Sequence, residues 1–291
     1  MTTNRAAALV CGLTLGLAAG SGSAAEPTLA WQTEGLQQPE SVVFDAEREV
    51  FYVSNVAGEP MDRNGEGHIS RVGPEGELLE AAWVSGLDAP KGLALHDDVL
   101  YVADIDRLIA IDVEEGEIAE TYEAQGAQFL NDVTADDQGR VYVSDMMANA
   151  IWRLDGDQFE LWVEDEALEQ PNGLLAEEDR IVVGSWGVMT DGFATQIPGH
   201  LKTVDLESGE VAGLGDGTPV GNLDGVEPDG DGGYLVTDWM AGALLRIDPE
   251  GKFEQLLDLN QGSADHTWLE DQRLAVIPMM SDGQLLAYRI E

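Results

Sequence analysis

Residues 129–163 read FLNDVTADDQGRVYVSDMMANAIWRLDGDQFELWV and contain the unit from which this chain is built. The polar residue Asn131 follows a turn and precedes a short apolar stretch. Three further short segments rich in Val, Ile, Tyr and Trp follow, separated by turns that carry Asp and Gly. Short runs of β-branched and aromatic residues between such turns are typical of antiparallel strands. The segment therefore predicts a sheet of four strands joined by tight turns.

The same unit occurs six times along the chain. Its polar position is occupied in order by Glu40, Lys91, Asn131, Asn172, Asp224 and Asp265, with steps of 51, 40, 41, 52 and 41 residues. Four strands in a repeat of about 40 residues are typical of a β-propeller blade. The sixth unit ends after its third strand, and Thr28–Gln32 (TLAWQ) resembles the missing fourth strand. We expect an all-β, six-bladed β-propeller that is closed by its N-terminal strand pairing with the last blade. An open pair of packed sheets is the alternative, but it would not explain six matched units.

The first 25 residues differ in character from the rest of the chain. A basic start and an apolar run precede the small residues Ser23, Ala24 and Ala25. This pattern predicts a signal peptide over residues 1–25, which leaves residues 26–291 as one propeller domain. We therefore expect a periplasmic or secreted protein without membrane insertion. The only cysteine, Cys11, lies in the predicted signal peptide, so the mature chain has no disulfide and no thiolate metal ligand.

The chain is strongly acidic, with a formal net charge of −42 at pH 7. Such a charge argues against nucleic acid and anionic membranes as partners. It is explained either by a solvated acidic surface suited to a salty environment or by a diffuse surface that collects cations. We expect a small-molecule partner and a monomeric protein.

In a closed ring the six polar positions face one axis. Glu40, Asn172 and Asp224 offer two carboxylates and an amide oxygen, and Asn131 offers a second amide. Oxygen-only donors suit Ca²⁺, or Mg²⁺ and Mn²⁺, better than softer metals. The alternative is that these residues cap turns at the strand entrances. Because four of them are in register, we expect one divalent cation, with Ca²⁺ as the first candidate.

These residues resemble a known motif set. A Glu in the first blade, Asn172 followed by glycine, and Asp224 followed by glycine are similar to the metal ligands of the senescence-marker-protein/gluconolactonase family. Asn131, followed by aspartate, matches an Asn that lies near metal and substrate in that family. The resemblance covers the mature chain, although each motif is only two or three residues long. It implies a six-bladed propeller, related to paraoxonases and strictosidine synthases, with one Ca²⁺ or Zn²⁺ in the central channel.

The chain departs from these families at two positions. Sugar lactonases have an Arg two residues before the Asn-Asp motif, where this chain has Phe129, and paraoxonases have a His where this chain has Lys91. A sugar lactone is thus a less suitable substrate. Lys91 either neutralises the carboxylates or acts on substrate with a shifted pKa. Asp265 is a ligand-supporting residue, a general base or a partner of Lys91. In a strand, the neighbouring His266 would point away from the axis, and we expect it to be structural.

Two insertions, Asn55–Gly67 and Gly184–Gly199, fall between second and third strands. The end of a second strand shares a face with the start of a first strand, so both insertions should overhang the polar ring. The same loops contain a series of Met and aromatic residues, among them Met147, Trp186, Phe193, Trp239 and Met280. They either pack neighbouring turns or line the mouth and bind an apolar substrate.

The leading hypothesis is an exported, divalent-metal-dependent hydrolase of lactones or related esters. Asp224, Asp265 and Lys91 are the catalytic candidates. Asn131, Met147, Trp186, Trp239 and Met280 are the candidates for substrate binding. The alternative is a non-catalytic propeller that binds a ligand or protein and uses the cation structurally.

Overall fold

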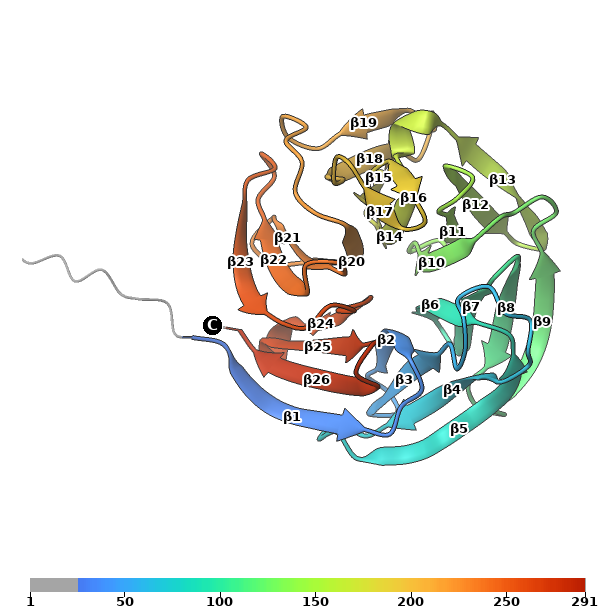
Figure 1. Ribbon diagram of the computed structural model, residues 1–291. Coiled ribbons are helices and arrows are strands. Elements are labelled where there is room, and N and C mark those ends of the chain that lie inside the picture. Colours follow the sequence, from blue (N-terminus) through green and yellow to red (C-terminus); the bar gives the residue numbers. More distant parts are fainter. Residues whose placement is uncertain (1–25, 291) are drawn as a thin grey trace, which may run out of the picture.

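The computed structural model describes residues 26–290, which form six four-stranded antiparallel sheets around a common axis (Figure 1). The predicted six-bladed β-propeller is therefore confirmed. The predicted signal peptide, residues 1–25, lies outside the described residues. Within the described part of the chain, no helix combines the length and hydropathy required to cross a membrane.

Each blade runs outward from the axis through four strands. The innermost strands are β2 (Pro39–Asp45), β6 (Pro90–His96), β10 (Leu130–Ala135), β14 (Pro171–Ala176), β20 (Leu223–Pro228) and β24 (Thr267–Leu269). The second strands are β3 (Val50–Asn55), β7 (Val99–Asp104), β11 (Val141–Asp145), β15 (Arg180–Ser185), β21 (Tyr234–Asp238) and β25 (Leu274–Met279). The third strands are β4 (Gly67–Val72), β8 (Arg107–Asp112), β12 (Ala150–Asp155), β18 (Leu201–Asp205), β22 (Ala243–Ile247) and β26 (Gln284–Arg289). The outermost strands are β5 (Leu78–Leu87), β9 (Glu117–Glu123), β13 (Gln158–Glu164), β19 (Val211–Gly213), β23 (Phe253–Asp258) and β1 (Thr28–Glu34).

Three small elements lie outside the blades. Two are short 3-10 helices, η1 (Glu166–Leu168) and η2 (Glu270–Gln272). The third is a hairpin of β16 (Met189–Asp191) and β17 (Ala194–Thr195), which occupies the second long insertion. The sequence predicted an insertion here but no strands within it.

The ring is closed as the sequence predicted. β1 is the outermost strand of the sixth blade and pairs antiparallel with β26, from Thr28 opposite Arg289 to Glu34 opposite Gln284. Trp31 of β1 also packs on Phe51 of the first blade, with ring centroids 5.7 Å apart. The N-terminal strand therefore joins the last blade to the first.

The apolar core lies between neighbouring blades. In one cluster, Tyr52 of the first blade packs with Leu100 of the second, and in another Val53 of the first blade packs with Leu285 of the sixth. Because each sheet is covered on its two faces by the two neighbouring blades, the inner strands carry nearly continuous apolar runs. All six residues of β3 are buried.

The aspartates that end several second strands have a structural role. Asp145 accepts hydrogen bonds from the backbone N–H groups of Gln128 and Phe129, both at 2.9 Å. Asp104 does the same for the segment before β6, with the Ala89 N–H at 2.7 Å. These carboxylates fix the chain just before it enters the innermost strand of the same blade. Turn capping was the alternative role proposed for the polar-ring residues. In these two blades, Asp104 and Asp145 cap the turn before the innermost strand instead.

A β-bulge places the polar ring. In five blades the polar residue is the second residue of the innermost strand, and the pairing with the second strand shifts register immediately beyond it. In β10, for example, Leu130 pairs with Asp145 but the next pair is Val133 with Val143. Such a bulge turns side chains out of the regular alternation of a strand. The sixth polar residue, Asp265, directly precedes the short β24.

Candidate active site at the mouth of the propeller

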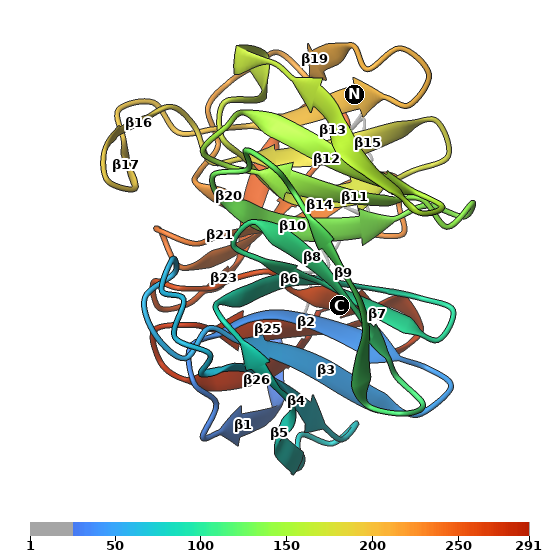
Figure 2. The same cartoon turned by 90° about the vertical axis from the view of Figure 1, so that its right-hand side faces the viewer.

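The two long insertions lie on the same face of the propeller (Figure 2). Residues of both line a cavity of about 320 Å³. Five of the six polar-ring residues form its floor, and residues of the second-to-third-strand loops form its walls. The lining consists of Gln38, Glu40, Gly58, Glu59, Pro60, Lys91, Phe129, Asn131, Met146, Asn172, Trp186, Phe193, Asp224, Trp239, Met280 and Ser281. Of the predicted substrate-binding residues, Met147 does not line this cavity. It packs behind the wall against the cluster formed by Phe129, Met146 and Trp186.

The floor joins side chains that are far apart in the sequence. The Asn131 side-chain amide donates a hydrogen bond to Asn172 Oδ1 at 2.5 Å. Burial and the nearby Asp265 carboxylate raise the pKa of Asp224 well above its ordinary value. A hydrogen bond from Asn172 favours the charged form of Asp224 and opposes this shift. Glu40 is 6% exposed, and its Oε2 atom is buried without a hydrogen-bond partner. The predicted ligand set, Glu40, Asn131, Asn172 and Asp224, is thus gathered in one place.

The charges on the floor repel one another. Burial raises the pKa of Glu40 well above its ordinary value, and the Asp224 carboxylate raises it further, whereas Lys91 lowers it. One ammonium therefore faces more than one carboxylate, in a site where unpaired charge is costly. An added cation would relieve this repulsion.

Whether the donors suit a metal can be judged from their chemistry. No group of three or more His, Cys, Asp or Glu side chains that could hold a metal ion is found within residues 26–290. The floor instead combines two carboxylates with two amide oxygens, and one buried oxygen of Glu40 lacks a partner. An all-oxygen set of this kind fits a hard divalent cation.

Lys91 lies on the floor rather than at the protein surface. It is 2% exposed, and its Nζ atom donates a hydrogen bond to Ala89 O at 2.9 Å. The ammonium also lies 4.6 Å from the centroid of the Phe129 ring. Burial lowers the pKa of Lys91 to about 8, although the carboxylates of Glu40 and Asp104 raise it. Glu40, and not Asp265, is therefore the polar-ring carboxylate whose charge raises the pKa of Lys91.

Asp265 lies on the inner side of the ring. It lines a second cavity of about 180 Å³, deeper in the channel, and accepts a hydrogen bond from Ser41 Oγ at 2.5 Å. Asp132 and Glu227 line the same inner cavity. Burial raises the pKa of Asp265 to about 7. Its charge also raises the pKa values of Asp132, Asp224 and Glu227. Asp265 is thus electrostatically linked to the floor without lining the outer cavity.

The structure corrects the expectation for His266. This residue also lines the inner cavity, because residues 265 and 266 precede β24 and the alternation of a regular strand does not apply to them. It is 2% exposed, and neither ring nitrogen has a hydrogen-bond partner among residues 26–290. Burial lowers the pKa of His266 to about 3. It is a neutral imidazole in the channel rather than a hydrogen-bonded structural histidine.

One wall of the outer cavity is continuously apolar. Trp186 lies 6.0 Å from Trp239 and 6.1 Å from Phe193, and Phe193 lies 6.1 Å from Phe129, measured between ring centroids. Met280 also lines the cavity. Trp186, Trp239 and Met280 thus line the cavity, and their role in substrate binding stays a prediction.

Several lining residues were missed by sequence reasoning. Gln38, Glu59 and Pro60 belong to the first blade and its long insertion, and Ser281 belongs to the sixth blade. The length of the insertion was the available signal, but its polar residues do not distinguish a cavity wall from a solvated loop. Asp132 and Glu227 of the inner cavity were also missed, because neither belongs to the repeated polar position.

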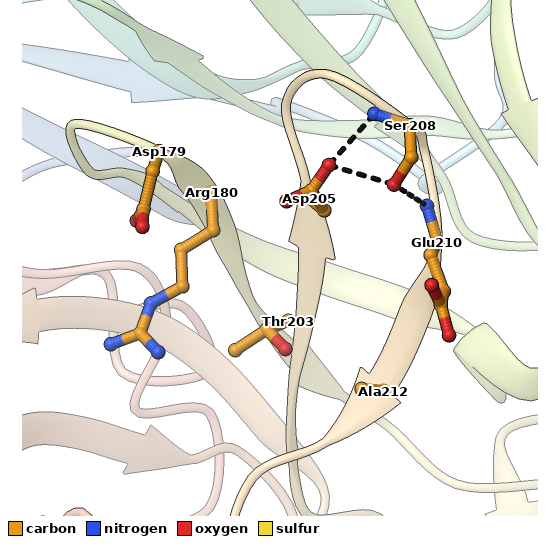
Figure 3. Close-up of a pocket in the computed structure, with 7 residues that line it drawn as sticks. All are labelled: Asp179, Arg180, Thr203, Asp205, Ser208, Glu210 and Ala212. Atoms are coloured by element: carbon orange, nitrogen blue, oxygen red, sulfur yellow. Dashed lines mark hydrogen bonds between the residues drawn. The ribbon is translucent and has the colours of Figure 1, made fainter.

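Another hollow, of about 250 Å³, lies on the fourth blade (Figure 3). It is lined by Asp179, Arg180, Thr203, Asp205, Ser208, Glu210 and Ala212. Arg180 begins β15, whereas the polar ring is near the other end of that strand, where Ser185 pairs with Pro171. Asp205 already accepts hydrogen bonds from Ser208. This hollow is separate from the channel.

The fold and the gathered floor define a six-bladed propeller with a polar cavity floor at its mouth. The family model described as the SMP-30/gluconolactonase/LRE-like region matches residues 38–262, so the chain belongs to this family. This confirms the predicted resemblance. A search of curated proteins found no significant match.

Solved structures agree on the fold. A gluconolactonase from Xanthomonas campestris is 14% identical with a TM-score of 0.67, over 91% of this chain and 89% of that one. Virginiamycin B lyase from Staphylococcus aureus is 11% identical with a TM-score of 0.64, over 91% and 100%. The Pan2 WD40 domain of Neurospora crassa is 12% identical with a TM-score of 0.59, over 91% and 96%. At such identities the similarity shows a shared propeller architecture alone.

Proposed function

We propose that the protein is a divalent-cation-dependent hydrolase of lactones or related esters that acts in the periplasm or outside the cell. The observation that carries this proposal is the cavity floor, where Glu40, Asn131, Asn172 and Asp224 from four different blades meet. Family membership and the gluconolactonase-like fold support the reaction class. The predicted signal sequence at residues 1–25 supports the location.

Glu40, Asn172 and Asp224 would hold the cation, with Asn131 beside them. Ca²⁺ is our first candidate because the donors are all oxygen, with Zn²⁺, Mg²⁺ and Mn²⁺ as alternatives. When bound, such an ion acts as a Lewis acid on a carbonyl oxygen.

The protein's own groups would perform the remaining steps. A carboxylate takes the proton of the attacking water, water oxygen bonds to the carbonyl carbon, and the ring C–O bond then breaks. The departing alkoxide oxygen takes up a proton, for which the Lys91 ammonium is suitably placed on the floor. Asp224 borders the outer cavity, whereas Asp265, with its pKa of about 7, would act from the inner side through a water molecule.

The cavity wall restricts the substrate. Its Trp and Phe rings offer apolar surface, and the Trp186 indole N–H already donates to Phe193 O at 2.9 Å. The hydroxyl groups of a sugar lactone would therefore find few partners along this wall, and unpaired buried polar groups are costly. Lactones or esters with an apolar portion fit better.

The test is a panel of aliphatic and aromatic lactones and esters, assayed with Ca²⁺ and then with chelator. We expect turnover that the chelator abolishes. Asp224→Asn should lose both metal binding and turnover while circular dichroism shows an intact propeller. The matched control is Asp97→Asn, because the Asp97 side chain is 89% exposed outside the channel. Metal binding without turnover of any substrate would favour the alternative of a non-catalytic binding propeller, and an Asp224→Asn protein with full metal content would refute the ligand assignment.

A further inference from the structure

The β16–β17 hairpin is a feature of the mouth that the blades do not require. It lies in the insertion between β15 and β18 of the fourth blade and projects beyond the sheets on the side of the cavity (Figure 2). Its two strands pair only with each other. Phe193, in the turn of this hairpin, nevertheless lines the cavity.

The two strands of chain that form the stem of the hairpin are closely packed. Gly187, with a φ of +95°, and Gly199 approach so closely that a Cβ on Gly187 would lie 2.6 Å from the Gly199 nitrogen. The Gly199 N–H donates to Trp186 O at 3.2 Å. The two chain segments of the stem are so close that neither glycine has space for a side chain.

Side-chain hydrogen bonds fix the rest of the hairpin over the cavity. The Trp186 indole N–H donates to Phe193 O at 2.9 Å. The Asn222 amide donates to Trp186 O at 2.8 Å and to Thr195 Oγ1 at 3.0 Å. Phe193 is therefore held in place before any ligand arrives, which lowers the entropy cost of binding.

Phe193 is also the wall residue with the most to gain from a ligand. Phe193 is 38% exposed, whereas the wall residues Trp239 and Met280 are half-buried and Phe129 and Trp186 are 3% and 4% exposed. With ring centroids 6.0–6.1 Å apart, the wall has no room for another ring to insert between its members. A ligand ring would instead lie on the wall and cover the exposed part of Phe193.

We propose that Phe193 determines substrate specificity by binding an aromatic substituent of the lactone, while the lactone carbonyl faces the polar floor. This inference rests on the proposed hydrolase function and specifies its substrate class. The outer cavity of about 320 Å³ is in the size range of small-molecule sites. Both portions of an aryl-substituted lactone then have matching surfaces, one apolar and one polar.

The experiment compares γ-butyrolactone with γ-phenyl-γ-butyrolactone. In Phe193→Ala, the ratio of kcat/KM for the phenyl lactone to kcat/KM for γ-butyrolactone should fall about five- to tenfold, the amount expected for one lost aromatic contact. Phe193→Tyr should restore the preference, since it keeps the ring. Phe253→Ala is the control, because Phe253 is 48% exposed on β23, at the outer edge of a blade. An unchanged ratio of the two kcat/KM values in Phe193→Ala would overturn the inference.

A binding measurement separates this inference from the proposed function. 5-Phenyl-2-pyrrolidinone is the lactam of the same shape and resists hydrolysis, so calorimetry can measure its affinity directly. We expect Phe193→Ala to weaken its binding about five- to tenfold. If no lactone is hydrolysed but this loss is seen, the subsite stands and the hydrolase proposal fails. If the lactam binds both proteins equally or binds neither, the subsite is refuted whatever the turnover.

Discussion

Replacing His266 with leucine should make the propeller more resistant to acid. The imidazole is buried in the inner cavity, both of its nitrogens lack partners, and burial lowers its pKa to about 3. In the unfolded chain, a histidine has a pKa of about 6.5. As the pH falls below that value, the unfolded state binds a proton that the folded state cannot accept. Acid therefore favours unfolding through this residue.

The size of the effect follows from the two pKa values. At pH 4 the unfolded imidazole is almost fully protonated and the folded one is mostly neutral, which costs about 3 kcal/mol of folding free energy. At pH 7.5 both states are neutral and this cost vanishes. Leucine cannot bind the proton, so the variant should gain about 3 kcal/mol over the wild type between pH 7.5 and pH 4.

Urea unfolding followed by tryptophan fluorescence, at both pH values and in EDTA, measures this difference. The carboxylates of the channel titrate in both proteins, so subtracting the wild type leaves the His266 contribution. His96→Leu is the control, because the His96 side chain is 31% exposed and the change should be under about 0.5 kcal/mol. If His266→Leu and wild type lose the same stability on acidification, the imidazole is not the buried neutral group described above.

The remaining predictions concern the floor, the ring closure and the caps. Lys91→Met should lower kcat and remove the fall in rate above about pH 8 that loss of the Lys91 proton causes in the wild type; a pH–rate profile that keeps this fall would exclude Lys91 as its source. Trp31→Ala should cost about 1–3 kcal/mol in urea unfolding, since it removes the contact with Phe51 across the closure; no change in midpoint would show that β26 pairing alone holds β1. Asp145→Ala should cost about 2–4 kcal/mol, because three backbone N–H groups lose their acceptor, whereas Asp145→Asn should recover part of this loss, and equal destabilisation by both variants would argue against the cap.

The fold could be predicted from the sequence because each blade repeats the same pattern of a polar residue and short apolar strands separated by turns. Apolar runs such as residues 50–55 follow from sheets buried on both faces, and the fragment TLAWQ revealed the closing strand. The hairpin β16–β17 could not be predicted, since its two- and three-residue strands are held by side chains such as Asn222 rather than by an apolar pattern.

The candidate site was partly predictable for the same reason. The polar position recurs in register, so Glu40, Asn131, Asn172 and Asp224 could be grouped before any coordinates were known. Depth along the channel could not be read from the repeat. Asp265 belongs to the inner cavity, and His266 joins it there, because the chain has not yet entered β24 at that point.

The pairing of β1 with β26 also bears on how the molecule folds. Thr33 and Leu285 are partners although about 250 residues separate them, so this contact carries one of the largest chain-closure costs in the protein. During synthesis, the first strand waits exposed until the last has been made. The five other blades are each complete within one contiguous stretch of chain and can form earlier. We expect the pairing between β1 and β26 to form last during folding. In the native protein, its amide groups should exchange hydrogen first, because this pairing opens most readily by local unfolding.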